Sequence, residues 1–156
     1  MNPLDIKQES QYSIHHILAN SYLVYLILFL VGVSLDLYFH LNILKDSIGT
    51  PLGILILLVG TLLIVWAQKT SRNLKKENLS KESFYKGPYR LTRGPTHLGL
   101  FFLVIGFAII VNALFILILA IFSYFFTKYT SLKKQEDALE IKYGAPYREY
   151  KQMVKF

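Results

Sequence analysis

The feature that most restricts the fold is an almost unbroken apolar run of 29 residues at 98–126. One upright membrane-spanning helix needs only about 20 residues. Two further apolar runs precede it, at residues 21–44 and 50–67. Because 53% of the chain is hydrophobic, a soluble fold would hold more apolar side chains than it could bury. We therefore expect one integral membrane domain over residues 1–156, in contact with the lipid bilayer.

The positions of the basic residues indicate how the long run crosses the bilayer. Of the 17 lysines and arginines, eight lie between residues 68 and 97 and seven lie from Lys128 onward. One helix through the whole run would place these two groups on opposite sides, whereas a tight hairpin near Asn112 places both on one side. Basic residues collect on the cytoplasmic side of membrane proteins. We therefore expect a multi-pass protein with a hairpin between its last two spans and both termini in the cytoplasm.

The predicted fold class is an all-α, polytopic membrane helix bundle with four transmembrane helices. The predicted spans are residues 21–44, 50–67, 97–111 and 113–128, with a cytoplasmic loop at 68–96 and a cytoplasmic C-terminal segment, including a helix, at 129–156. Gly53 and Gly60 are seven residues apart in the second span, and therefore on one face. Small residues at this spacing let a neighbouring helix approach closely.

Composition excludes several kinds of chemistry. The chain has no cysteine, which excludes disulfides, thiolate zinc sites and a cysteine nucleophile. The adjacent pair His15-His16 is poorly placed to share a metal, because neighbouring residues on a helix point about 100° apart. We therefore expect no metal site. The net charge of +7 flanks the apolar spans, so membrane topology explains it better than a nucleic-acid partner does.

Asp36 and His40 are ionisable residues within the first predicted span. They are four residues apart and therefore share one helix face. Ionisable residues inside a membrane suggest a functional site by default. If the span instead runs over residues 18–37, both side chains lie in the headgroup region, and we favour this second interpretation.

Special residues are densest at residues 87–99, which have the sequence GPYRLTRGPTHLG. Because proline suits the first turn of a helix, Gly94 and Pro95 are predicted to be the N-cap and first residue of the third span. Gln135 and Glu136 follow the fourth span. A hairpin would bring these two polar segments together, so we expect them to line one pocket at the cytoplasmic surface.

The predicted pocket combines groups that recognise charge and groups that recognise rings. The helix N-terminus at Gly94 favours a carboxylate or phosphate, Arg93 adds a bidentate donor, and Glu136 offers an anion. Tyr89 and His97 offer flat rings. S-adenosylmethionine, with a carboxylate, a cationic centre and an aromatic base, would use all of them. Phosphate-bearing or lipid ligands match several of the same groups, so they stay open. Arg93 and Glu136 are the best candidates for a direct part in catalysis.

Four motifs occur together in about the last 75 residues. They are Gly87-Pro88-Tyr89-Arg90, Arg93-x-Pro95-x-His97-x-Gly99, Glu136 before Tyr143-Gly144, and Tyr147-x-x-Tyr150-x-x-x-Val154. In combination they resemble the isoprenylcysteine carboxyl methyltransferase and phospholipid methyltransferase superfamily. Each motif alone is weak, but the set is specific.

The resemblance implies S-adenosylmethionine as the cofactor. It also implies an amphiphilic acceptor that enters from the lipid, either a prenylcysteine-type carboxylate or a phospholipid headgroup. The implied cofactor-binding residues are Tyr89, Arg93, Gly94, Pro95, Thr96, His97, Gly99 and Glu136. If the acceptor is already a carboxylate, methyl transfer needs little acid–base chemistry and positioning would supply most of the rate.

Three positions depart from the family pattern. Relatives commonly have His, Tyr and Glu where this chain has Gly94, His97 and Gln135. A second hypothesis is therefore a non-catalytic membrane protein that keeps the methyltransferase scaffold with a degenerate site. A third hypothesis is a small NADPH-dependent relative of the membrane sterol reductases, which share the hairpin.

Overall fold

The structure is a computed structural model that describes residues 3–43, 48–74 and 85–154. Every regular element within those ranges is helical, which confirms the predicted all-α class. The longer helices are α1 (Pro3–Phe39), α2 (Gly49–Leu74), α4 (Pro95–Ile110) and α5 (Leu114–Thr127). The shorter elements are the 3-10 turn η1 (Gly87–Arg90), the π-helical segment η2 (Lys128–Leu132), α6 (Lys133–Tyr143) and α7 (Ala145–Met153).

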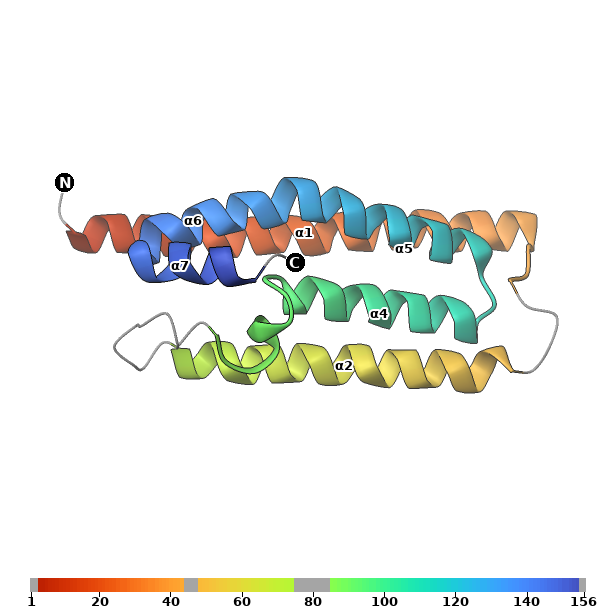
Figure 1. Cartoon of the computed structure of the whole chain (residues 1–156). Helices are drawn as coiled ribbons and strands as arrows, with labels where there is room; N and C mark the ends of the chain where they lie inside the picture. The colour runs from red at the N-terminus through yellow and green to blue at the C-terminus, as the bar shows by residue number, and fades with distance from the viewer. Residues whose placement is uncertain (1–2, 44–47, 75–84, 155–156) are drawn as a thin grey trace.

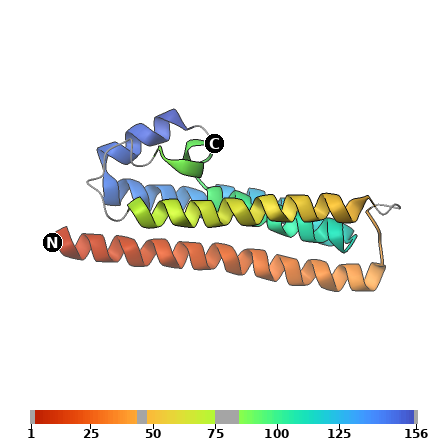
Figure 2. The same ribbon diagram turned by 90° about the horizontal axis from the view of Figure 1, so that it is seen from below.

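The long helices lie side by side along a common axis (Figure 1). α1 packs against α5 and α6, whereas α2 packs against α4 and η1. α5, η2 and α6 follow one another as a single rod, and α7 lies beside α6 (Figures 1 and 2). This arrangement places the C-terminal part of α2, the start of α4 and both C-terminal helices at the same end of the bundle.

Within the described ranges, three helical segments are long and apolar enough to cross a membrane, namely Ala19–Phe39, Gly49–Arg72 and Leu114–Ile141. α4 is also apolar but shorter, at 16 residues. Large apolar side chains are exposed along the outer faces, for example Leu26 at 56% and Leu55 at 60%. An apolar exterior of this kind marks a surface that faces lipid.

Two helix boundaries differ from the prediction. α1 ends at Phe39, whereas the first span was expected to continue to residue 44. His40 has a φ of 53°, a left-handed conformation that stops a helix. α2 continues to Leu74, into the region 68–96 that was expected to be a loop. The added stretch contains neither glycine nor proline, so nothing in it interrupts the helix.

Two pairs of glycines set the contact between α2 and α4. A Cβ atom added to Gly60 would lie 2.7 Å from the carbonyl oxygen of Gly99, and one added to Gly53 would lie 2.7 Å from that of Gly106. Larger side chains at these four positions would therefore push the helices apart. This confirms the predicted packing role of Gly53 and Gly60, and it identifies their partners.

Asp36 ties α1 to the start of α5. Its carboxylate accepts hydrogen bonds from the backbone N–H groups of Phe115 and Ile116, both at 2.9 Å. These donors belong to the first turn of α5, which has no acceptors of its own for them. His40 is exposed, and its Nδ1 atom lies 3.3 Å from the carbonyl oxygen of Tyr38. Asp36 is thus a helix cap, and the geometry gives no support to a functional pair with His40.

The chain reverses direction between α4 and α5 (Figure 1). Asn112 lies in the left-handed region with a φ of 58°, a conformation that asparagine tolerates better than most residues. Its side-chain oxygen accepts a hydrogen bond from the N–H of Ile43 at 2.8 Å. The long apolar run is therefore interrupted at the residue that the sequence predicted.

Candidate functional site

A cavity of about 430 Å³ lies where the end of α2 meets the first turn of α4, α6 and α7. Its volume falls within the range of about 300–1,000 Å³ that is typical of small-molecule sites. Tyr22, near the start of the apolar part of α1, and Gln68, near the end of that of α2, both line it. The cavity therefore lies at the border between the apolar and polar parts of the bundle. The lining residues are Tyr22, Gln68, Ser71, Arg72, Tyr89, Arg93, Gly94, Pro95, Thr96, His97, Leu132, Gln135, Glu136, Leu139, Tyr143, Tyr147 and Tyr150.

The structure brings together seven of the eight residues that were predicted to bind a cofactor. The seven that line the cavity are Tyr89, Arg93, Gly94, Pro95, Thr96, His97 and Glu136. Gly99 does not line it, because it lies against α2. A Cβ atom on Gly99 would lie 2.6 Å from Cγ1 of Ile64 and 2.9 Å from the carbonyl oxygen of Gly60. Gly99 is therefore a helix-packing residue in this structure, and its part in cofactor binding stays a prediction.

The first turn of α4 forms one wall of the cavity. Gly94 is the N-cap and Pro95 the first helical residue, as the sequence predicted. The backbone N–H groups of Thr96 and His97 belong to this turn, where an α-helix leaves its donors without intrahelical acceptors and carries the positive end of its dipole. Gly94 is buried, and a Cβ atom there would lie 2.9 Å from Cδ1 of Leu132. The lack of a side chain at this position lets η2 approach the turn.

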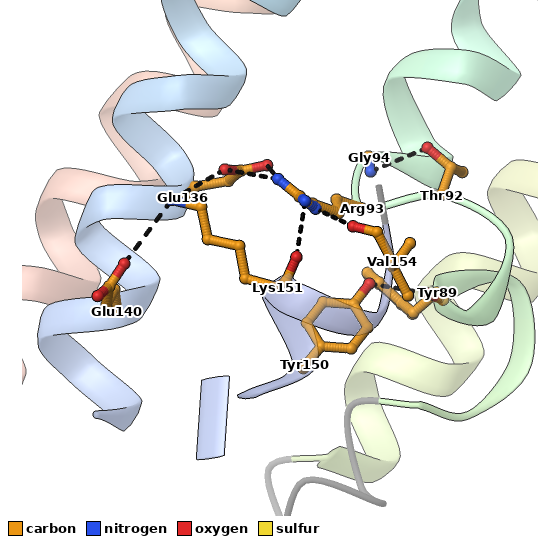
Figure 3. Close-up of polar contacts among 9 residues, drawn as sticks. All are labelled: Tyr89, Thr92, Arg93, Gly94, Glu136, Glu140, Tyr150, Lys151 and Val154. Carbon is orange, nitrogen blue, oxygen red and sulfur yellow. Dashed lines mark hydrogen bonds and ion pairs between the residues drawn. The ribbon is translucent and has the colours of Figure 1, made fainter. Parts of the chain in front are cut away.

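Arg93 joins three elements (Figure 3). Its Nη1 donates to both carboxylate oxygens of Glu136, at 3.2 and 3.3 Å. Its Nη2 donates to the carbonyl oxygen of Lys151 at 2.7 Å, and its Nε donates to that of Val154. Both carbonyls lie at the C-terminal end of α7, where backbone acceptors lack helical partners. The expectation of a free bidentate donor for a ligand anion is therefore corrected, because acceptors of the protein itself occupy the guanidinium.

Glu136 likewise has cationic partners on more than one element. Nζ of Lys151 lies 3.2 Å from its Oε2 and 3.7 Å from Oε2 of Glu140. Glu140 in turn pairs with Arg148 at 2.8 Å, near the surface. The side chains of Arg93 and Glu136 are only 18% and 11% exposed. Glu136 therefore lines the cavity as the centre of an ion-pair network and not as an isolated anion.

α7 supplies an aromatic wall. Tyr147, Tyr150 and Val154, the residues of the fourth sequence motif, are buried in one cluster. The hydroxyl of Tyr150 donates to the carbonyl oxygen of Tyr89 at 2.7 Å (Figure 3). Burial raises the pKa of both Tyr147 and Tyr150, and the Glu136 carboxylate raises that of Tyr147 further. These phenols therefore stay neutral throughout the physiological pH range.

His97 is buried, with 6% of its surface exposed. Within the described part of the chain, neither of its ring nitrogens makes a hydrogen bond. The side chain of Gln135 lies beside the ring as its nearest possible hydrogen-bond partner, and the ring of Tyr22 is 6.4 Å away between centroids. Because buried polar atoms in proteins nearly always have a partner, the ring nitrogens of His97 are left to Gln135 or to a ligand.

The first two helices contribute to the cavity wall, which was not predicted from the sequence. Gln68, Ser71 and Arg72 line the cavity from α2. Ser71 and Arg72 follow Gln68 by three and four residues, a spacing that places all of them on one helix face. The spacing could not be used as a signal because this segment was predicted to be a loop. Tyr22 on α1 gave no usable signal, because it is one of several aromatic residues at the start of a predicted span.

The π-helical segment η2 lies between the membrane-type helix α5 and the polar helix α6. A π segment pairs each N–H with the fifth preceding carbonyl, so it rotates the helix that follows it relative to an uninterrupted α-helix. Beyond it, Gln135, Glu136 and Leu139 face the cavity. Such segments often occur at functional sites, which agrees with the position of η2 at the cavity wall.

The fold and the cavity together define an integral membrane protein of helical type with a cavity of small-molecule size at one end of its apolar part. The phospholipid methyltransferase family model matches residues 48–145, which is more than half of the chain. The chain thus belongs to the phospholipid methyltransferase family, a family of membrane methyltransferases, and the resemblance found in the sequence is confirmed. Comparison with the curated proteins and with the solved structures gives no match.

The matched range covers most of the cavity but not all of it. It includes α2, η1, α4, α5, η2 and α6. α1 lies before the matched range and α7 lies almost entirely after it. The family match therefore does not cover the parts of the cavity wall that Tyr22 on α1 and Tyr147 and Tyr150 on α7 contribute.

Proposed function

We propose that this protein is a membrane-embedded methyltransferase that uses S-adenosylmethionine and methylates an amphiphilic acceptor. The acceptor is either a phospholipid headgroup or a prenylcysteine-type carboxylate. The observation that carries the proposal is the shared cavity. It brings together Arg93, in the segment before α4, and Glu136 on α6, which are 43 residues apart in the chain and form an ion pair. Both residues belong to the family pattern.

The residues of the cavity fit this cofactor in three respects. The first turn of α4 offers backbone donors and a positive dipole end to the carboxylate of the amino-acid part. The rings of Tyr89, Tyr143 and Tyr147 offer flat apolar surfaces to the base. Among the described residues, the ring nitrogens of His97 make no hydrogen bond of regular geometry, and a buried polar group costs about 1–3 kcal/mol unless a ligand or a neighbour such as Gln135 satisfies it.

When bound, S-adenosylmethionine supplies an electrophilic methyl group on a sulfonium centre. The chain's own contribution is mainly positioning, since holding two reactants in line converts a bimolecular step into an effectively unimolecular one. The backbone N–H groups of Thr96 and His97 bind the carboxylate of the cofactor. Arg93 and Glu136 hold the first turn of α4 against α6 and α7. Tyr150 and Tyr147 exclude water from the cytoplasmic side of the cavity, because they are nearly fully buried within it.

The membrane topology forms part of this proposal. We infer four crossings, with α4 and the first part of the α5 rod as the last two, and with both termini cytoplasmic. The 16 residues of α4 extend about 24 Å, a short crossing that suits a helix whose first turn forms a ligand site at the membrane surface. The basic residues that flank α4 and α5 at the cavity end support a cytoplasmic cavity.

One observation favours the alternative of a non-catalytic scaffold. Arg93 and Glu136, the candidates for a direct part in catalysis, neutralise each other and serve the docking of α7. A binding measurement separates the two functions, because a degenerate site would not retain the cofactor. The family match favours both of these hypotheses over the NADPH-dependent reductase.

The test measures binding of radiolabelled S-adenosylmethionine to purified protein in lipid nanodiscs. Ser71→Trp fills the cavity from α2 without touching the Arg93 network, and it should weaken binding at least tenfold. Thr61→Trp places the same ring on the exposed side of the same helix and should bind like the wild type. Absence of wild-type binding in both detergent and lipid would reject the proposal, as would wild-type affinity in Ser71→Trp.

A further inference from the structure

α7 follows α6 through a single connecting residue, Gly144. This residue is the C-cap of α6 and also the N-cap of α7. Its φ of 67° and ψ of −137° form a combination that glycine adopts far more readily than other residues. A Cβ atom added there would have no heavy atom within 4 Å other than those of its chain neighbours, so nothing in the described residues packs against the link. The dihedral angles of one glycine therefore set the angle between the two helices.

The contacts that hold α7 in its present position are largely polar (Figure 3). Nζ of Lys151 lies 3.2 Å from Oε2 of Glu136 and 3.7 Å from Oε2 of Glu140, and Arg148 pairs with Glu140 at 2.8 Å. Arg93 donates hydrogen bonds to two carbonyl oxygens at the C-terminal end of the helix. Water can replace each of these partners, so partly exposed contacts of this kind break and form again at a small cost in free energy.

The other described walls of the cavity are parts of the packed bundle. α2 and α4 touch through their glycine pairs, η1 packs on α2, and the rod of α5, η2 and α6 packs along α1. Moving any of these walls would separate helices of the bundle. α7 packs mainly against α6 and lies beside it at the cavity end (Figures 1 and 2). It can therefore turn about Gly144 while the bundle stays intact.

We propose that α7 is a lid over the cofactor cavity, shown here closed, which opens about Gly144 to exchange the cofactor with the cytoplasm. This inference rests on the proposed function and adds the route by which the cofactor enters and leaves. S-adenosylmethionine and its demethylated product are charged and soluble in water, so they arrive from the cytoplasmic side. Tyr147 and Tyr150 of α7 form part of the cavity wall there, and both are buried.

Arg93 is the latch of this lid. The same guanidinium binds the Glu136 carboxylate on the cavity wall and the carbonyl oxygens of Lys151 and Val154 on the lid. Closure of α7 therefore completes the wall and fixes the Arg93 side chain in one step. A lid that must open before each exchange limits both the entry and the release of the ligand.

The first experiment locks the hinge. Glu140 and Arg148 lie four residues before and after Gly144, and neither lines the cavity. Because the chain has no cysteine, Glu140→Cys, Arg148→Cys can be joined selectively by a short, reducible bis-methanethiosulfonate crosslinker. Release and uptake of radiolabelled S-adenosylmethionine in nanodiscs should slow by about tenfold or more after crosslinking, and reduction should restore both rates. Before crosslinking, binding like that of the wild type shows that the variant is folded.

The matched control places the same crosslinker within α6. Asp137 and Ile141 are both exposed and are four residues apart on one helix face. Asp137→Cys, Ile141→Cys therefore carries an equal modification close to the lid, but this crosslink does not span Gly144. It should leave both exchange rates unchanged.

The second experiment weakens the attachment of the lid. Lys151→Met keeps the length of the side chain and removes its ion pairs with Glu136 and Glu140. The rates of cofactor association and dissociation should both rise, by about two- to fivefold, the range of a partly exposed ion pair. A fixed wall that has become looser would raise the dissociation rate alone. Lys134→Met removes an equal charge from an exposed position on α6 and should exchange like the wild type.

The outcomes separate this inference from the proposed function. Wild-type binding of S-adenosylmethionine with unchanged exchange after the hinge is crosslinked would overturn the lid and leave the methyltransferase in place. Slowing that reduction does not reverse, or that the crosslink within α6 also produces, would overturn the lid as well. The same holds if Lys151→Met raises the dissociation rate alone or changes neither rate. No cofactor binding by the wild type would overturn both proposals together.

Discussion

Arg93 and Glu136 are 43 residues apart in the chain, and their side chains form an ion pair at 3.2 Å inside the candidate site. The same guanidinium also caps the C-terminal end of α7 through the carbonyl oxygens of Lys151 and Val154. One side chain thus connects the approach to α4 with α6 and α7. The cavity exists because these segments are held together, so the pair is as much a structural element as a part of the site.

Arg93→Ala should destabilise the protein and release α7. Glu136 keeps Lys151 as a cation, but the carbonyl oxygens of Lys151 and Val154 lose their charged donor. Hydrogen bonds from a charged group contribute about 1.5–3 kcal/mol each, so the loss should be several kcal/mol. The measurements are thermal melting in detergent micelles and the rate of tryptic cleavage at Lys151 on α7, a site that both variants keep. Arg148→Ala is the control, since its side chain is 66% exposed and its pair with Glu140 should contribute at most about 1 kcal/mol. Equal melting temperatures for the two variants would contradict the role given to Arg93.

Gly99→Ala should weaken the contact between α2 and α4 without touching a ligand. The new methyl group would lie 2.6 Å from Cγ1 of Ile64, so the helices must separate, at a cost of about 1–3 kcal/mol for overpacking. Thermal melting of the variant measures this cost. Thr61→Leu on α2 adds a larger side chain on the exposed side and serves as the control. If Gly99→Ala melts like the wild type but loses cofactor binding, Gly99 belongs to the binding site after all.

Asp36→Ala should lower stability and leave cofactor binding unchanged. The substitution removes the carboxylate that accepts the N–H groups of Phe115 and Ile116 at the start of α5. Loss of a helix N-cap costs about 0.5–2 kcal/mol. Melting temperatures of Asp36→Ala and Asp36→Asn compare removal of the acceptor with its replacement by an uncharged one. The asparagine variant should keep part of the stability that the aspartate cap contributes. Loss of methyl transfer at normal stability would instead revive the hypothesis of a functional residue within the first span.

The folded protein should lose stability in alkaline solution above about pH 10. The pKa of Tyr147 and of Tyr150 is raised above the ordinary tyrosine value by burial, so the unfolded chain gives up these protons at lower pH than the folded chain does. The stability that the two buried phenols contribute is complete below about pH 10, the ordinary tyrosine pKa. It declines as the pH rises from there toward their pKa values in the folded protein. Melting temperatures over this range should fall less steeply in a Tyr147→Phe, Tyr150→Phe double variant than in the wild type.

A matched control for this pH experiment is Tyr129→Phe, which removes a phenol that is 75% exposed. At neutral pH, Tyr150→Phe should also cost about 0.5–1.5 kcal/mol, because it loses the hydrogen bond to the Tyr89 carbonyl. An alkaline transition that is identical in the double variant and in the wild type would show that other groups control it.

Local signals in the sequence predicted much of the fold. Gly94 and Pro95 start α4, Asn112 marks the interruption of the long apolar run, and Gly53 and Gly60 form a packing stripe. In each case the signal is a conformational property of the residue itself, or a spacing on one helix. The glycine spacing predicted a close neighbour, but not which helix would supply it.

Sequence signals at Arg93, Glu136 and Asp36 did not predict the partners of these side chains. A charged residue near a membrane surface can serve a ligand, the solvent or another segment equally well, and its own neighbours along the chain do not distinguish these uses. Position on the folded backbone decides the matter. The guanidinium of Arg93 lies among acceptors of α6 and α7, and the carboxylate of Asp36 lies at the start of α5.

The sequence by itself determined that this chain is helical and apolar, where one helix begins and where the long run is interrupted, since backbone preference and side-chain hydropathy are properties of short stretches. The tertiary structure alone decided that α2 carries one wall of the cavity, that Gly99 packs against α2, and that the ring of His97 is buried beside Tyr22 and Gln135. These depend on which atoms from distant segments come within a few ångströms of one another, and no local pattern encodes that distance.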